Sequence, residues 1–207
     1  DLIEKKELDA EIVSVISNHQ DAFALVRAQK HNLPTKVIIY QNKINDKIAR
    51  NEYDQQILNY VKEINPDLIL LSGWQMILGE PLLKQLQKLQ IPVINQHPAL
   101  LTSNHVNEVA TSRGLIPVLR GSHVAKDAFE QKLQVSGISI HQILPGDFYD
   151  VGPVIMKAEV RIKPDDTLES YKQNMQTTEH LLIQSAIKRV VHVLKHNIDI
   201  SKGKFIW

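Results

Sequence analysis

Three polar side chains in this sequence could form an acid–base site: Asn95, His97 and Asp150. Asn95 and His97 stand two residues apart after a short apolar run, so on extended backbone both side chains point to the same side. An amide donor and an imidazole would then face one reacting atom, and Asp150 could complete the set with a carboxylate. The alternative is structural, with Asn95 capping a turn and His97 bonded to a backbone carbonyl.

Strands and helices alternate through the first hundred residues, and this order must position the candidate site. The hydrophobic patterns predict strands at 10–17, 36–40, 67–73 and 91–95, with helices at 21–32, 52–64 and 82–89 between them. That alternation is typical of an α/β fold with a mostly parallel sheet and helices on both faces. Ligands bind beyond the carboxyl ends of the strands in such sheets, which is where Asn95 and His97 stand.

The pattern changes in the second half of the chain. Residues 137–144 and 153–162 predict an antiparallel strand pair at the C-terminal end, and 167–194 predicts one long helix begun near Thr167. The segment 101–120 has the weakest pattern of all. Because long irregular connections usually serve as lids or binding loops, we expect it to be a mobile loop.

Composition restricts the class of protein. The chain has 207 residues, 43% of them apolar and 23% charged, which suits one globular domain or two small ones. A formal net charge of +1 gives no basic field for nucleic acid or anionic lipid, so neither is expected as a partner. The longest apolar stretch, 68–78, is too short to span a bilayer.

The absence of cysteine excludes a disulfide framework, a thiolate metal site and a cysteine nucleophile, and it is compatible with the cytoplasm, where we expect the protein. Glycine is also scarce: there are 8, against roughly 14 at average usage, and the first is Gly73. A glycine-rich phosphate loop therefore does not lie in the first third of this chain.

Two segments carry a family resemblance. Residues 95–101, NQHPALL, resemble the N-x-H-P-[SA]-L-L signature of the folate-dependent formyltransferases, and residues 150–155, DVGPVI, resemble their D-x-G-P-[IV]-I segment. The resemblance implies a single formyltransferase domain of Rossmann-like fold over 1–207. It also implies a first strand and a glycine-rich phosphate loop upstream of Asp1, with residues 1–3 as the end of the following helix.

The resemblance further implies transfer of a formyl group from 10-formyltetrahydrofolate to the amine of glycinamide ribonucleotide in purine biosynthesis, with no metal. His97 and Asn95 would donate to the oxyanion of a tetrahedral intermediate, while Asp150 would hold or raise the pKa of His97 and help to pass the amine proton. The family often has histidine at the position of His141, for which a structural hydrogen bond is an equal alternative. The protein would be a monomer or homodimer.

Binding residues also follow from the resemblance. The folate would contact Met76, Ile77, Leu78, Gln142 and Asp147, and the ribonucleotide or a substrate carboxylate would contact Arg50, Gln176 and Glu179. The structural alternatives are a solvated arginine for Arg50 and helix capping or packing for Glu179.

The sequence also departs from the family within the matched region. Met76 stands where many relatives carry arginine, and 101–121 is longer than the family loop by about a dozen residues, after which Gly121 restores the family's glycine. The competing functions are hydrolysis of 10-formyltetrahydrofolate, formylation of a sugar nucleotide, and folate or nucleotide binding without catalysis.

Overall fold

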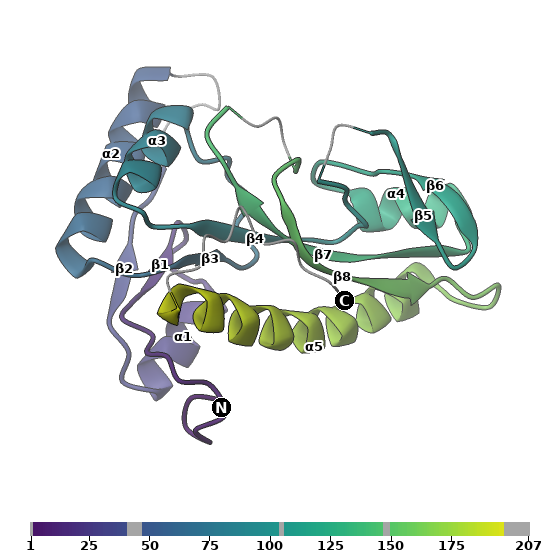
Figure 1. The fold of residues 1–207 in the computed structure, drawn as a ribbon, viewed down its shortest axis with the longest axis horizontal. Coiled ribbons are helices and arrows are strands. Elements are labelled where there is room, and N and C mark those ends of the chain that lie inside the picture. The colour runs from purple at the N-terminus through teal and green to yellow at the C-terminus, as the bar shows by residue number, and fades with distance from the viewer. Residues whose placement is uncertain (1, 41–46, 104–105, 147–149, 197–207) are drawn as a thin grey trace. The chain divides into compact units, whose positions relative to one another are not determined.

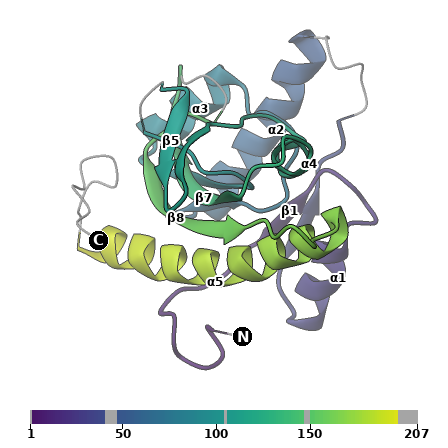
Figure 2. The same cartoon turned by 90° about the vertical axis from the view of Figure 1, so that its right-hand side faces the viewer.

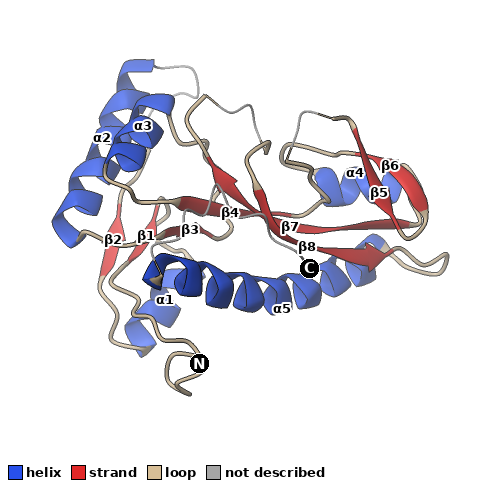
Figure 3. Cartoon of the chain, viewed as in Figure 1, coloured by secondary structure: helices blue, strands red, loops and turns tan. Residues whose placement is uncertain are grey.

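The structure, a computed structural model, describes residues 2–40, 47–103, 106–146 and 150–196. Their contacts form two compact units, one from Asp1–Leu68 with Met76–Ile91 and the other from Ile69–Gln75 with Pro92–Trp207. Strands and helices occur in both units (Figure 3), which confirms the predicted α/β class. The single domain expected across 1–207 remains a prediction.

The first unit holds a short parallel strand pair and three helices. Its elements are β1 (Val15–Ser17), α1 (Phe23–Lys30), β2 (Thr35–Val37), α2 (Lys47–Ile64) and α3 (Glu80–Lys88). The ladder runs from the pair Val15 and Thr35 to the pair Ser17 and Val37, so both strands are shorter than predicted. Residues 2–6 form turns, which corrects the helix end expected at 1–3.

A buried carboxylate ties α2 to the start of α3, and Figure 1 draws these two helices side by side. Asp54 on α2 is 5% exposed, and its Oδ2 accepts a hydrogen bond of 2.9 Å from the backbone N–H of Gly79, the N-cap residue of α3. The carboxylate thus satisfies an amide at the helix N-terminus from outside the helix. A Cβ at position 79 would overlap this carboxylate, so the contact requires glycine.

The second unit is built on a four-stranded sheet in the order β3-β4-β7-β8. Its strands are β3 (Ile69–Leu71), β4 (Val93–His97), β7 (Val135–Ile143) and β8 (Val154–Arg161). β3 and β4 are parallel, whereas β7 is antiparallel to both β4 and β8, which confirms the antiparallel C-terminal pair. The sheet is therefore mixed in direction. β7 lies between two strands and is contacted by α4 and α5, and it is buried over almost its whole length.

Two helices pack within this unit. α5 (Leu168–Lys195) runs along β7 and β8, as Figures 1 and 2 show, and begins with a capping box between Thr167 and Ser170 close to the predicted start. The sequence patterns did not predict α4 (Val124–Glu130). Its Phe129 ring stacks on Tyr171 of α5 at a centroid distance of 6.2 Å.

The prediction of an irregular loop over 101–120 is wrong. This segment contains a hairpin of β5 (Glu108–Thr111) and β6 (Gly114–Pro117), joined by a turn that ends at Gly114 with φ of +100°. The cross-strand pair Val109 and Ile116 is buried with Leu100 and Val135. This packing explains why the hairpin forms although each strand has only four residues.

Candidate active site

Four polar side chains share one face of the β4–β7 strand pair. Asn95 is paired with His141, and His97 with Ser139, in the antiparallel register. Directly opposed residues lie on the same face, and residues two apart along a strand do too. The register therefore adds His141 and Ser139 to the pair that the spacing predicted. His97, His141 and Ser139 are buried, and Ser139 accepts a hydrogen bond from the Leu101 N–H.

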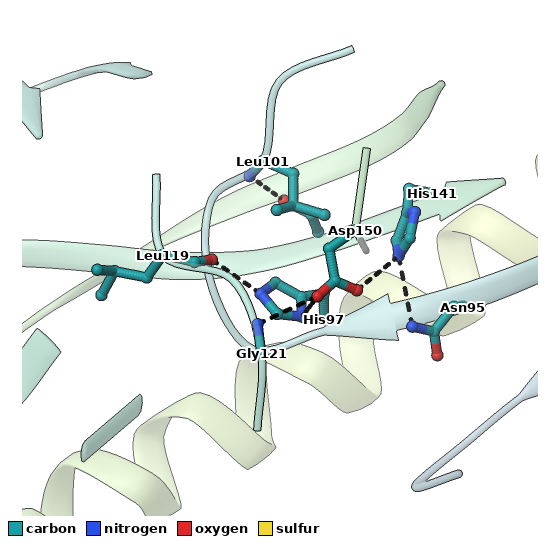
Figure 4. Close-up of polar contacts among 8 residues, drawn as sticks. Asn95, His97, Leu101, Leu119, Gly121, His141 and Asp150 are labelled. Carbon is teal, nitrogen blue, oxygen red and sulfur yellow. Dashed lines mark hydrogen bonds and ion pairs between the residues drawn. The ribbon is translucent and has the colours of Figure 1, made fainter. Parts of the chain in front are cut away.

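Asp150 reaches both histidines from the loop before β8 (Figure 4). Its Oδ2 lies 3.4 Å from His97 Nδ1, and its Oδ1 lies 3.6 Å from His141 Nε2. The Gly121 N–H donates to Oδ2 at 3.3 Å. Asp150 has φ of +57°, the left-handed region in which aspartate and asparagine are the commonest residues after glycine. The structure thus brings the three predicted catalytic residues together in the second unit.

Both ring nitrogens of His97 face oxygen atoms. Nε2 lies 3.0 Å from the Leu119 carbonyl, while Nδ1 faces the Asp150 carboxylate. Only the imidazolium can donate to both oxygens at once. Burial lowers the pKa of His97, and the Asp150 carboxylate and the Leu119 carbonyl raise it in opposition. The expectation that Asp150 raises this pKa therefore describes one contribution, whereas the net shift is downward.

His141 favours the neutral form. Burial lowers its pKa to about 4, although the Asp150 carboxylate acts in the opposite direction. Its Nε2 lies 3.4 Å from the Asn95 amide nitrogen, so a neutral ring can accept a hydrogen bond there. The amide nitrogen of Asn95 carries two hydrogens, and donation to His141 uses one of them. His141 therefore orients the Asn95 amide. The sequence did not indicate this role.

The lowered pKa of His141 predicts a loss of stability in mild acid. The ordinary pKa of histidine is 6.5, and that of His141 in the folded protein is about 4. Between these two pH values, His141 binds a proton in the unfolded chain but not in the folded chain. Lowering the pH from 7 to 5 should cost about 2 kcal/mol at this residue. His141→Gln should reduce that loss by the same amount in urea unfolding at the two pH values. Exposed His123→Gln is the control, and equal losses in wild type and His141→Gln would contradict the prediction.

Three backbone and side-chain contacts at the site were not predicted. The Leu119 carbonyl and the Gly121 N–H touch His97 and Asp150, and the Arg120 guanidinium acts to lower the pKa of His97. Gly121 has φ of +99°, and its match to the family's glycine was the available signal. The structural alternative for His97, a bond to a backbone carbonyl, is also present at Leu119.

The residues expected to contact folate fall in both units. In the first, Met76 is half-buried, Ile77 is 55% exposed and Leu78 is buried, on the segment before α3. Gln142 is buried on β7 in the second unit, opposite Ile94, and so lies on the other face of the strand from His141. Asp147 lies outside the described residues. Folate contact at these positions remains a prediction.

Arg50 is engaged inside the first unit. Its Nε lies 3.5 Å from Asp54 Oδ1, and its guanidinium lies 5.9 and 5.6 Å from the ring centroids of Tyr40 and Tyr53. The solvated arginine proposed as its structural alternative is therefore wrong, since the side chain is 23% exposed and paired. Substrate contact at Arg50 remains a prediction.

Gln176 and Glu179 lie on α5 in the second unit. Gln176 is exposed, whereas Glu179 is half-buried, and burial raises the pKa of its carboxyl. Three residues apart on a helix, the two side chains are neighbours on its surface. Ribonucleotide contact at both positions remains a prediction.

Within the described ranges, no cluster of three or more histidine, aspartate or glutamate side chains is arranged to hold a metal ion. No helix in the same ranges combines the length and hydrophobicity needed to cross a membrane.

Comparison with known proteins identifies the family of this chain. A family model described as formyl transferase matches residues 1–187, and the chain belongs to that family. This confirms the resemblance carried by residues 95–101 and 150–155.

Its relatives include the phosphoribosylglycinamide formyltransferase of Dictyostelium discoideum, 35% identical over 200 residues, with 91% of this chain and 88% of the relative covered. The enzyme of the same name from Saccharomyces cerevisiae is 32% identical, with 90% and 86% covered. The fold is similar to the crystal structure of phosphoribosylglycinamide formyltransferase from Bacillus halodurans, with a TM-score of 0.74, 23% identity, and 92% and 86% of the two chains covered.

Proposed function

We propose that this protein transfers the formyl group of 10-formyltetrahydrofolate to the amine of glycinamide ribonucleotide. The observation that carries the proposal is the contact of Asp150 with both His97 and His141 beside the Asn95 amide. Both reported relatives are named phosphoribosylglycinamide formyltransferase, which supports the same reaction. Folate and the ribonucleotide are therefore the proposed small-molecule partners.

The chemistry requires donors for a developing oxyanion. The amine nitrogen attacks the formyl carbon, and the carbonyl oxygen takes up negative charge in the tetrahedral intermediate. The second N–H of Asn95 and the Nε2–H of His97 are the proposed donors. For His97, the formyl oxygen would replace the Leu119 carbonyl at Nε2.

Proton transfer completes the exchange. The attacking amine must lose a proton, and N10 of the folate must gain one when its bond to the formyl carbon breaks. Asp150 is the proposed relay, directly or through water, because its carboxylate lies at ion-pair distance from both imidazoles. It also favours the imidazolium form of His97, which carries the donor hydrogen.

The test is a formyl-transfer assay with the full chain. The protein is incubated with 10-formyltetrahydrofolate in the presence and absence of glycinamide ribonucleotide, and deformylated folate and formylated product are measured. We expect the two products in equal amounts and only with the ribonucleotide present. Folate deformylation independent of the ribonucleotide would instead establish a hydrolase. Formylation of a sugar nucleotide in place of the ribonucleotide would establish a sugar-nucleotide formyltransferase.

A further inference from the structure

The β5–β6 hairpin leads directly into the segment 119–121, which touches both His97 and Asp150. The Leu119 carbonyl lies 3.0 Å from His97 Nε2, and the Gly121 N–H donates to Asp150 at 3.3 Å (Figure 4). Both contacts use backbone atoms. Their geometry therefore depends on what holds the backbone of this segment in place.

The turn of the hairpin is fixed to β8. Ser112 lies in this turn, and both its N–H, at 2.8 Å, and its hydroxyl donate to the carboxylate of Glu159. The two bonds end on different carboxylate oxygens. Glu159 thus holds one end of the hairpin through two charge-assisted hydrogen bonds.

The base of the hairpin is closed by two further bonds. The Val118 N–H donates to the Asn107 carbonyl at 2.8 Å, and Arg120 Nη2 donates to the Val106 carbonyl at 3.2 Å. Between turn and base, Val109 and Ile116 are buried against the core. The hairpin is therefore held at its turn, its face and its base, and the strand β6 continues into Leu119 within two residues.

We propose that the β5–β6 hairpin is a positioning element for His97, in which the anchor between Ser112 and Glu159 keeps the Leu119 carbonyl at Nε2. The nitrogen that is to donate to the formyl oxygen then carries its hydrogen before substrate binds. This last step rests on the proposed function, whereas the contact itself does not. Ser112 and Glu159 are positioning residues, since they act on His97 through Leu119.

The charged and titratable groups around His97 determine how its pKa changes when the anchor is lost. Asp150 raises the pKa of His97, Arg120 lowers it, and His141 lies on the far side of the Asp150 carboxylate. The Leu119 carbonyl favours the charged ring. If the hairpin shifts and this acceptor withdraws, the pKa of His97 must fall.

The experiment measures His97 directly, in the full chain, by NMR titration of ¹⁵N-labelled histidine rings, with His97→Gln used for assignment. Glu159→Ala and Ser112→Ala should each lower the pKa of His97, by about half a pH unit for Glu159→Ala. Ser112→Ala keeps the backbone bond and is the milder variant should Glu159→Ala not fold. The double variant should shift the pKa no further than Glu159→Ala, because both changes break one anchor.

Glu108→Ala is the matched control, since it removes an exposed carboxylate from the same hairpin. It should leave the titration of His97 as in wild type. An unchanged or raised pKa in the anchor variants, or an equal shift in Glu108→Ala, would overturn the proposal. The titration needs no turnover, so a shift in a protein without formyl transfer would refute the proposed function and retain the positioning role.

Discussion

Replacing His97 with alanine is expected to lower kcat for formyl transfer by about a thousandfold or more, because one oxyanion donor alone supplies roughly two to three orders of magnitude. The change also removes the imidazole that faces the Asp150 carboxylate. The measurement is product formation from 10-formyltetrahydrofolate and glycinamide ribonucleotide at saturating substrate. The fold should persist, as judged by circular dichroism and thermal unfolding, because His97 is the last residue of β4 and the pairing of β4 with β7 is made by backbone atoms.

Exposed His123→Gln serves as the control for the loss of a histidine. It should turn over as wild type does. Undiminished turnover in His97→Ala, with the protein folded, would rule out the donor role of the imidazole and with it the proposed mechanism.

Replacing Asp150 with asparagine is expected to lower kcat by about a hundredfold or more, with a much smaller change in KM, because general acid–base groups contribute about that much to the chemical step. Asparagine keeps the size of the side chain and tolerates the left-handed backbone at this position. The variant therefore removes charge with little change in shape.

The pH profile provides a second measurement on Asp150→Asn. The carboxylate raises the pKa of His97, so its loss should lower that pKa further. Since the imidazolium is the proposed donor, activity is lost as pH rises through the pKa of His97. The alkaline limb of kcat should move to lower pH in Asp150→Asn and stay in place in exposed Asp165→Asn. A limb that does not move would show that Asp150 acts on some other group.

Local sequence patterns predicted the elements whose ends are determined by neighbouring residues. The start of α5 was predicted within a residue because Thr167 and Ser170 form a cap that depends only on neighbouring residues. α2 begins at Lys47, five residues before the predicted start at Glu52, and no acidic residue in its first turn marks that end. The β5–β6 hairpin was missed because its formation depends on packing against Leu100 and Val135, which lie outside the hairpin.

The site likewise has features that local sequence predicts and features that depend on residues far apart in the chain. The two-residue spacing of Asn95 and His97 is a local feature, and it correctly predicted that the two side chains share a face. The place of His141 depends on strand register, which joins residues 46 positions apart. The contact of Leu119 with His97 is made by a backbone carbonyl, which every residue type possesses, so no pattern of side chains could indicate it.

The left-handed backbone at Asp150 limits which substitutions natural variation can supply there. Glycine would relieve the backbone but remove the carboxylate, and glutamate would keep the charge but adopt this φ at a steric cost. Asparagine suits the backbone and cannot carry the charge. Aspartate alone meets both demands, so every substitution at this position gives up either the carboxylate or the favourable backbone conformation.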